Sequence, residues 1–270
     1  MNSHYADAHL PQRLREALEA EGLNPHQLTL DDLAPLDQLH VGGRRATRQL
    51  IEAVGLSAPA QVLDLGCGTG GSSRLLAHEY GCQTLGVDIT PEFIQVAEQL
   101  TAATGLTSSC SFVCADAAHL PLAEASFDYV LCQHSLLNMP DLTPVLAEIH
   151  RLLKPGGQLL LHEVVQGENT EPLLLPVPWA RQAEQSHLLT PEALYQRLLQ
   201  AGLVQDYHQD ISAAATAWRS KHTQREARGQ AGILTPQLIF GADFVQMGRN
   251  LAENLRSGRV RLIAAAWHRP

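Results

Sequence analysis

Short apolar segments alternate with helix-like segments along residues 60–165, and this alternation limits the possible folds more than any other feature of the chain. Strands are predicted at residues 62–65, 84–88, 111–114, 127–132 and 158–165. Helices are predicted between them at 72–80, from 90 onward, and at 145–153. Strands that alternate with helices are joined by crossovers, which make the strands parallel and cover the sheet on both faces. The sequence therefore predicts a doubly wound α/β domain.

The flanking regions extend this core. Helices are expected at residues 9–21, 44–54, 190–201, 213–228 and 235–256, and strands at 203–211 and 258–268. We interpret the chain as a single domain with four parts: an N-terminal helical cap (1–43), a core (44–211), a helical lid (212–257) and a final strand (258–270).

Composition excludes several classes of protein. Lys and Arg number 19 against 28 Asp and Glu, and no basic run is longer than Arg44-Arg45, so we expect no nucleic-acid partner. No apolar stretch approaches the ~18–20 residues of a membrane helix, and the first residues lack the features of a signal peptide. Five cysteines without a Cys-x-x-Cys indicate reduced thiols, and the histidine spacing indicates no metal site. These features favour a cytoplasmic protein and leave its oligomeric state open.

The most informative motif runs from Asp64 to Gly71, between a predicted strand and a predicted helix. Gly66 and Gly68 allow backbone torsions and a close ligand approach that a Cβ would prevent. Asp88 ends the next strand, where an acid can accept hydrogen bonds from both hydroxyls of a ribose. The glycines also fit a dinucleotide-binding loop, which leaves an NAD-dependent oxidoreductase as an alternative. Asp64 and the lack of a basic residue before Arg74 favour a cationic nucleoside, S-adenosylmethionine (SAM), over a pyrophosphate.

Together with this loop, four further segments resemble the motifs of class I SAM-dependent methyltransferases: 86–88, 114–121, 126–130 and 152–157. The resemblance implies a mostly parallel, seven-stranded, Rossmann-like sheet whose last strand is antiparallel beside the fifth. It implies that Asp88 holds the ribose, that Asp116 and Ala117 border the adenine, and that Gly66 and Gly68 lie under the methionine part. The full set of expected cofactor residues is Asp64, Gly66, Gly68, Gly70, Asp88, Ile89, Asp116, Ala117 and Gln133. The segment Lys154–Gly157 and the pair Asp116-Ala117 disfavour the oxidoreductase.

A narrower resemblance lies mainly outside these motifs. Residues 37–43, 133–139, 240–243 and 256–259 are similar to the bacterial sarcosine/dimethylglycine N-methyltransferase-like group. This resemblance implies methyl transfer to the amine nitrogen of a small, amino-acid-like acceptor, with S-adenosylhomocysteine as the product. A C-methyltransferase acting on a quinone-like or other lipophilic ring, and a SAM-binding protein without transferase activity, remain alternatives.

Four side chains are candidate catalytic groups. A general base is needed only if the acceptor arrives protonated. His134, His162 and Glu163 follow or end the fourth and fifth strands, where ligands bind in doubly wound folds. Alternation along the fifth strand places His162 and Glu163 on opposite faces, so we expect one of them to point at the ligand. His40 lies in the segment before the core, and each candidate could instead be a hydrogen-bonded structural residue.

Two residues after the fifth strand are candidates for contact with the acceptor. Trp179 could stabilise a methylated cation, and Arg181 could bind a carboxylate. If the segment is extended, both side chains face the same side. Alternatively, Trp179 fills the edge of the core and Arg181 pairs with an acid such as Glu184. Because aromatic residues make up only 5% of the chain, we expect a small polar acceptor.

Overall fold

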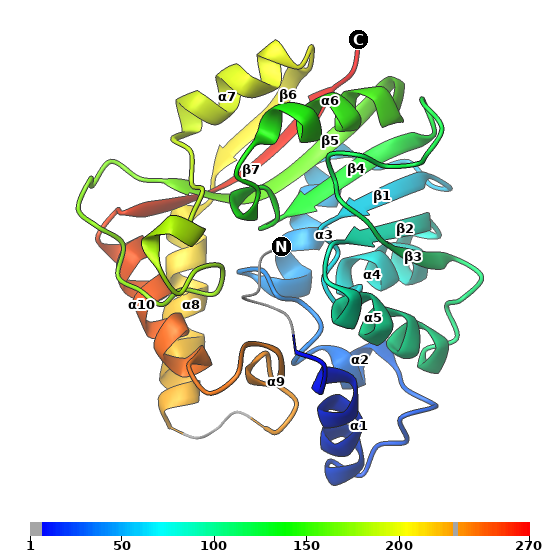
Figure 1. Ribbon diagram of the computed structural model, residues 1–270, viewed down its shortest axis with the longest axis vertical. Helices are drawn as coiled ribbons and strands as arrows, with labels where there is room; N and C mark the ends of the chain where they lie inside the picture. Colours follow the sequence, from blue (N-terminus) through cyan, green and yellow to red (C-terminus); the bar gives the residue numbers. More distant parts are fainter. Residues whose placement is uncertain (1–6, 229–231) are drawn as a thin grey trace.

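The structure is a computed structural model that describes residues 7–228 and 232–270. The first six residues of the expected cap and residues 229–231 of the expected lid lie outside this part. One seven-stranded sheet crosses the molecule in the order β3-β2-β1-β4-β5-β7-β6 (Figure 1). Its strands are β1 (Gln61–Leu65), β2 (Gln83–Asp88), β3 (Cys110–Cys114), β4 (Phe127–Gln133), β5 (Leu153–Gln166), β6 (Val204–Asp210) and β7 (Val260–His268). Strands β1 to β5 are parallel, and β7 runs antiparallel to β5 and β6, which confirms the expected sheet.

Helices cover both faces of the sheet. They are α1 (Leu10–Ala20), α2 (Leu30–Leu33), α3 (Gly43–Val54), α4 (Gly71–Tyr80), α5 (Pro91–Ala103), α6 (Leu142–Leu152), α7 (Pro191–Gln200), α8 (Ser212–Ala227), α9 (Gln237–Phe240) and α10 (Phe244–Arg256). Side chains alternate between the faces along β1, so Val62 packs in the cluster of α3 and α4 while Leu63 packs in that of α6 and α7. This produces the three-layer arrangement of a doubly wound domain.

Two sequence-based expectations differ from the structure. The single helix expected over 235–256 is two helices, α9 and α10, because Gly241 adopts φ 79° and ψ −164°, which no helix continues. Strand β5 begins at Leu153, so Gly156 and Gly157 belong to the strand instead of preceding it. Their backbone groups pair with Arg269 near the end of the chain, at 2.7 and 2.9 Å, and this distant partner extends the strand.

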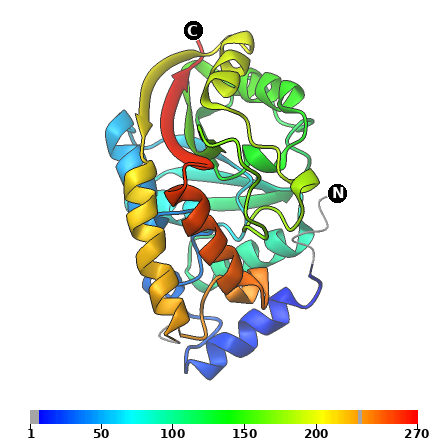
Figure 2. The same ribbon diagram turned by 90° about the vertical axis from the view of Figure 1, so that its left-hand side faces the viewer.

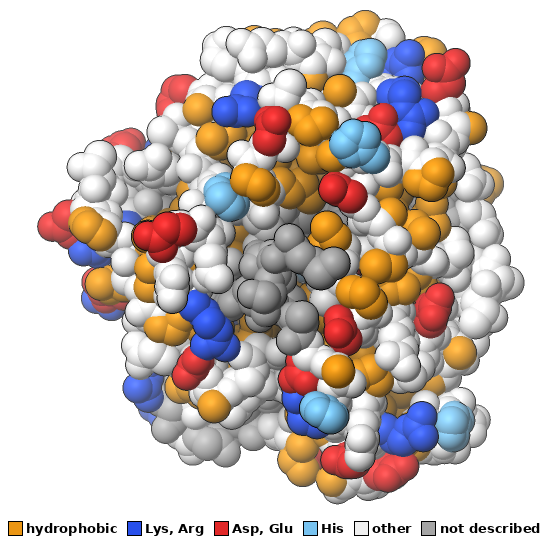
Figure 3. Space-filling model, in the orientation of Figure 1, with side chains coloured by type: hydrophobic (Ala, Val, Ile, Leu, Met, Phe, Trp, Pro, Cys, Tyr) orange, Lys and Arg blue, Asp and Glu red, His pale blue; other side chains and the backbone are white. Residues whose placement is uncertain are grey.

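The expected lid consists mainly of α8 and α10, which pack side by side against each other and contact β7 (Figure 2). No helix among residues 7–228 and 232–270 is long and apolar enough to cross a membrane. On the face drawn in Figure 3, Lys and Arg side chains are dispersed among acidic and apolar ones. All five cysteines lie in the described part, and none forms a disulfide there.

The buried guanidinium of Arg74, on α4, connects three separate segments. It donates hydrogen bonds to the Asp37 carboxylate, the Thr69 carbonyl (2.6 Å), the Ala97 carbonyl (3.1 Å) and the Thr101 hydroxyl (3.0 Å). Both Arg74 and Asp37 have fully buried side chains. The carbonyl of Asp37 also lies against Gly71, where any Cβ would overlap it. The N-terminal segment, the glycine loop and α5 are therefore held together at the start of α4.

Replacing Arg74 by Met should lower the free energy of unfolding by about 3–5 kcal/mol, because the buried Asp37 carboxylate loses its counter-charge. The matched control is Arg48→Met, since the Arg48 side chain is 43% exposed and its pair with Glu79 should contribute about 1 kcal/mol or less. Urea denaturation of both variants at pH 7 measures the difference. Equal losses in the two variants would contradict the assigned role of Arg74.

Candidate active site

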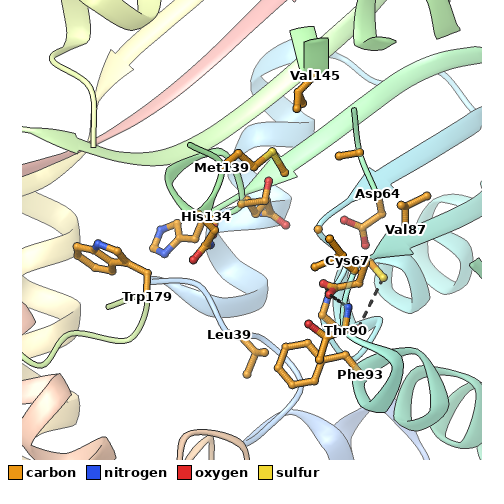
Figure 4. Close-up of a pocket in the computed structure, with 18 of the residues that line it drawn as sticks. Leu39, Asp64, Cys67, Val87, Thr90, Phe93, His134, Met139, Val145 and Trp179 are labelled. Atoms are coloured by element: carbon orange, nitrogen blue, oxygen red, sulfur yellow. Dashed lines mark hydrogen bonds between the residues drawn. The ribbon is translucent and has the colours of Figure 1, made fainter. Parts of the chain in front are cut away.

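A cavity of about 700 Å³ opens where β1, β2, β3 and β4 end, and in parallel sheets ligands bind at this edge. Figure 4 shows Trp179 and His134 at one end of it and Asp64, Val87 and Thr90 at the other. All the expected cofactor residues except Gly70 line it: Asp64, Gly66, Gly68, Asp88, Ile89, Asp116, Ala117 and Gln133. The topology therefore brings cofactor candidates from four separate segments to one cavity.

The glycine loop is shaped by close packing as well as by its torsions. Gly66 adopts φ 79°, and a Cβ there would overlap the side chain of Ser135. Gly70 precedes α4, and a Cβ there would lie 2.7 Å from the Phe112 ring, so this glycine packs inside the fold instead of lining the cavity. Asp64 accepts a hydrogen bond of 2.6 Å from the Ser73 hydroxyl, and its burial raises its pKa to about 6.

Asp88 lies at the end of β2 and shapes the loop. Its carboxylate accepts hydrogen bonds from the backbone N–H groups of Gly68 (3.0 Å) and Thr90 (2.9 Å). Burial raises the pKa of Asp88, and these two N–H groups act in the opposite direction. A carboxylate has about four acceptor positions, so Asp88 retains capacity for two further donors in the cavity.

Three histidines form a cluster at the other end. The rings of His134 and His162 stack with centroids 5.2 Å apart, and the His40 ring lies 5.3 Å from that of His162. Burial lowers the pKa of His40 to about 4 and that of His162 to about 3, and it holds the pKa of His134 well below its usual range. All three are therefore neutral at pH 7. Within the described part of the chain, no group of three or more His, Cys, Asp or Glu side chains is arranged to hold a metal ion.

His134 and His40 both line the cavity, but their surroundings differ. His134 Nε2 is buried and has no hydrogen-bond partner among the described residues. His40 Nε2 lies 3.1 Å from the Thr47 hydroxyl, 3.2 Å from the Gly43 carbonyl and 3.3 Å from Gln133 Nε2, so this nitrogen belongs to a polar network. The ring of His134, unlike that of His40, is therefore not part of a polar network among the described residues, and it lines the cavity as a neutral imidazole.

Neither His162 nor Glu163 lines the cavity, so the expectation that one of them faces the ligand is wrong. The chain turns after β4 and covers both side chains. His134 stacks on His162, and Glu163 Oε1 accepts hydrogen bonds from the backbone N–H groups of Ser135 (2.9 Å) and Leu136 (3.0 Å). Burial raises the pKa of Glu163 to about 7.

Trp179 and Arg181 do not share a side. Val177 and Ala180 exchange backbone hydrogen bonds of 2.8 and 3.1 Å, so the segment is a tight turn and the assumption of an extended chain is wrong. Trp179 lines the cavity and donates its indole N–H to Ser186 at 2.9 Å. Arg181 lies outside the cavity and pairs with Asp243, while Glu184, its expected partner in the alternative interpretation, lines the cavity.

Several lining residues were not identified from the sequence: Leu39, Phe93, Asn138, Met139, Glu184, Gln185, His187 and Phe240. They lie in loops and helix ends far apart in the chain. Leu39, Asn138, Met139 and Phe240 fall within the segments of the narrower resemblance, but nothing in their local pattern assigns them to the cavity wall. The charged residues of the whole described cavity wall are all of one sign. Acids line the cavity, but no Lys or Arg among the described residues does so.

The sequence of the chain is similar to those of known methyltransferases. A family model described as a methyltransferase domain matches residues 63–161. Methyltransferase GfsG of Streptomyces halstedii is 37% identical over 142 residues, which is 53% of this chain and 51% of that protein. O-methyltransferase cnsE of Penicillium expansum is 30% identical over 199 residues, which is 71% of this chain and 70% of that protein.

The names of other relatives cover different acceptor atoms. They include a sterol 4-C-methyltransferase of Caenorhabditis elegans, a tocopherol O-methyltransferase of Arabidopsis thaliana and an ajmaline N-methyltransferase of Rauvolfia serpentina. The chain spans only 35%, 29% and 47% of their lengths, and about half of GfsG. The family therefore does not determine the acceptor atom.

Solved structures show the same fold. A putative sarcosine dimethylglycine methyltransferase from Galdieria sulphuraria has a TM-score of 0.74 at 18% identity, over 95% of this chain and 98% of that one. The [4+2]-cyclase SpnF has a TM-score of 0.68 at 23% identity, over 96% and 94%. These likenesses establish the fold and do not confirm the narrower sarcosine/dimethylglycine group. Because the similarity to the Penicillium enzyme extends over 70% of its length, and the sheet has the antiparallel last strand that the motifs implied, the chain belongs to the class I SAM-dependent methyltransferases.

Proposed function

We propose that the protein transfers the methyl group of SAM to an amine nitrogen of a small molecule that is neutral or cationic. The observation that carries the proposal is the composition of the cavity: the ring of a neutral histidine lines one end, and the described wall carries Asp and Glu side chains but no Lys or Arg. A cavity of this kind favours a positively charged cofactor and an acceptor that carries no negative charge.

The end near Asp88 fits SAM. When bound, SAM supplies a methyl group already activated by the positive sulfur. The free acceptor positions of Asp88 suit the two ribose hydroxyls, and Asp116 and Ala117 would border the adenine. The backbone of Gly66 and Gly68 carries no side chain into the cavity, so the methionine part can lie against it. Asp64 adds an acid near the expected positive charges.

The end near His134 suits an amine. An amine that arrives protonated must lose a proton before it can attack, and the neutral His134 ring, which lines the cavity, is the proposed acceptor of that proton. Trp179 borders the same end, but it is only 3% exposed and packs in an apolar cluster, as the alternative interpretation expected, so we assign it to the wall and not to the stabilisation of a cation.

The sequence resemblance implies an amino-acid-like acceptor, and Arg181 is the candidate to bind its carboxylate. Arg181 is outside the cavity and paired with Asp243. We therefore propose an acceptor amine that has no carboxylate.

Replacing Asp88 by Ala should weaken SAM binding about 10- to 150-fold, because charge-assisted hydrogen bonds contribute roughly 1.5–3 kcal/mol. Isothermal titration calorimetry measures the Kd, and urea denaturation confirms that the variant is folded. Glu124→Ala, which removes an exposed acid outside the cavity, is the control. Unchanged affinity in a folded Asp88→Ala variant would exclude Asp88 from the cofactor site.

Replacing His134 by Ala should lower kcat by roughly 10²–10⁴ while the Kd for SAM changes little, because the proton acceptor is lost and the cofactor contacts remain. His78→Ala is the matched control, since His78 is exposed on α4. Release of S-adenosylhomocysteine at saturating acceptor measures the rate. A variant that loses stability but retains kcat would show that His134 is structural.

Acceptor charge provides a third test. In a panel of amines screened with SAM, adding a carboxylate to an accepted amine should lower kcat/KM about 10-fold or more, because the buried carboxylate would find no cation. Methyl esters of the same compounds are the control for size. Preference for the carboxylates would contradict the proposal. Turnover of hydroxyl or carbon acceptors alone would assign an O- or C-methyltransferase. SAM binding without turnover of any acceptor would favour a SAM-binding protein without transferase activity.

A further inference from the structure

The chain turns sharply directly after β4, at residues 134–136. His134 adopts φ 53°, a left-handed conformation that residues other than glycine rarely occupy. The short 3₁₀ helix Leu136–Asn138 follows immediately. Because the conformation is intrinsically unfavourable for histidine, contacts from the surrounding structure must maintain it.

Two consecutive residues of β5 supply those contacts. The carbonyl of His162 accepts the N–H of His134 at 2.9 Å, as the last hydrogen bond between β4 and β5. Glu163 Oε1 then accepts the next two N–H groups, those of Ser135 and Leu136. Three successive backbone donors of the turn are therefore bound from one strand.

Glu163 is buried away from the cavity, and its described hydrogen-bond partners are the amides of the turn. Its side chain is 1% exposed and does not line the cavity, so it cannot touch a ligand there. Its second oxygen, Oε2, has no hydrogen-bond partner within the described part of the chain. Burying a carboxyl is unfavourable unless hydrogen bonds compensate, and here the compensation comes from the two amides that follow His134.

The turn also contacts the cofactor side of the site. Ser135 packs so closely on Gly66 that a Cβ at Gly66 would overlap it. A shift of residues 134–136 would therefore change the position of the His134 ring relative to the glycine loop. Misplacement of a reacting group by about 1 Å can lower a rate by about 10²-fold.

From this geometry we infer that Glu163 is a positioning residue for methyl transfer: by binding the amides of Ser135 and Leu136, it sets where the His134 ring stands relative to cofactor and acceptor. The inference rests on the proposed role of His134. Glu163 itself contacts neither ligand and is not a catalytic residue.

The first test compares Glu163→Leu with Glu163→Gln. Leucine removes the acceptor, so kcat should fall about 10- to 100-fold while the Kd for SAM changes less than about threefold. Glutamine retains Oε1 as an acceptor of similar reach, so it should restore kcat at least about fivefold above that of Glu163→Leu. Equal kcat values in the two variants, or a loss confined to the KM and Kd, would overturn the inference. If Glu163→Leu does not fold, Glu163→Asp replaces it, because the shorter carboxylate draws the amides out of place.

The second test is a double-mutant cycle. If Glu163 acts through His134, then Glu163→Leu should lower kcat by no more than about twofold when His134 is already Ala. An equal loss in both backgrounds would show that Glu163 acts elsewhere and would overturn the inference. The proposed function fails in a different way, namely if His134→Ala alone leaves kcat unchanged. Urea denaturation and SAM titration of every variant confirm that all four proteins of the cycle are folded and bind the cofactor.

Discussion

The buried Arg74 guanidinium is the interaction on which the cofactor end of the cavity depends. It is a cation without access to water, so its charge must be matched inside the fold, and Asp37 supplies the match from the N-terminal segment. The same group binds the carbonyl of Thr69 in the glycine loop and that of Ala97 on α5. One side chain thereby fixes the N-terminal segment against the glycine loop, and Leu39 and His40, which follow Asp37 closely in the chain, lie on the cavity wall.

The acceptor end depends on a different constraint, the register of β4 and β5. Gln133 pairs with His162, so the turn that follows β4 lies over the next residues of β5. Burial then keeps the histidine cluster neutral, since desolvation lowers the pKa of each ring. A wall of low dielectric that carries acids and neutral imidazoles favours bound cations over bound anions. This preference comes from the wall as a whole and not from one side chain.

Much of the fold could be predicted because its strands and helices follow from patterns of residues that are close together in the chain. Strands β1 to β4 are short apolar runs, and α4 ends at a glycine, as such helices commonly do. Predictions failed where a distant partner or one torsion decided the outcome. Gly241 divides a helix that periodicity alone makes continuous, and the end of the chain extends β5 through Gly156. The turn at Val177–Ala180 separated Trp179 from Arg181 because its hydrogen bonds are not visible in the residue types.

The sequence by itself determined the sheet, the glycine loop, the acid at Asp88 and the family, because these features depend on residues close together in the chain and on their spacing. Only the tertiary structure decided which candidate side chains reach the cavity. It placed His134 on the wall, covered His162 and Glu163 beneath the turn that carries it, and turned Arg181 away to Asp243. The reason is physical: a side chain's exposure depends on what packs over it, and here the covering residues come from other strands and loops.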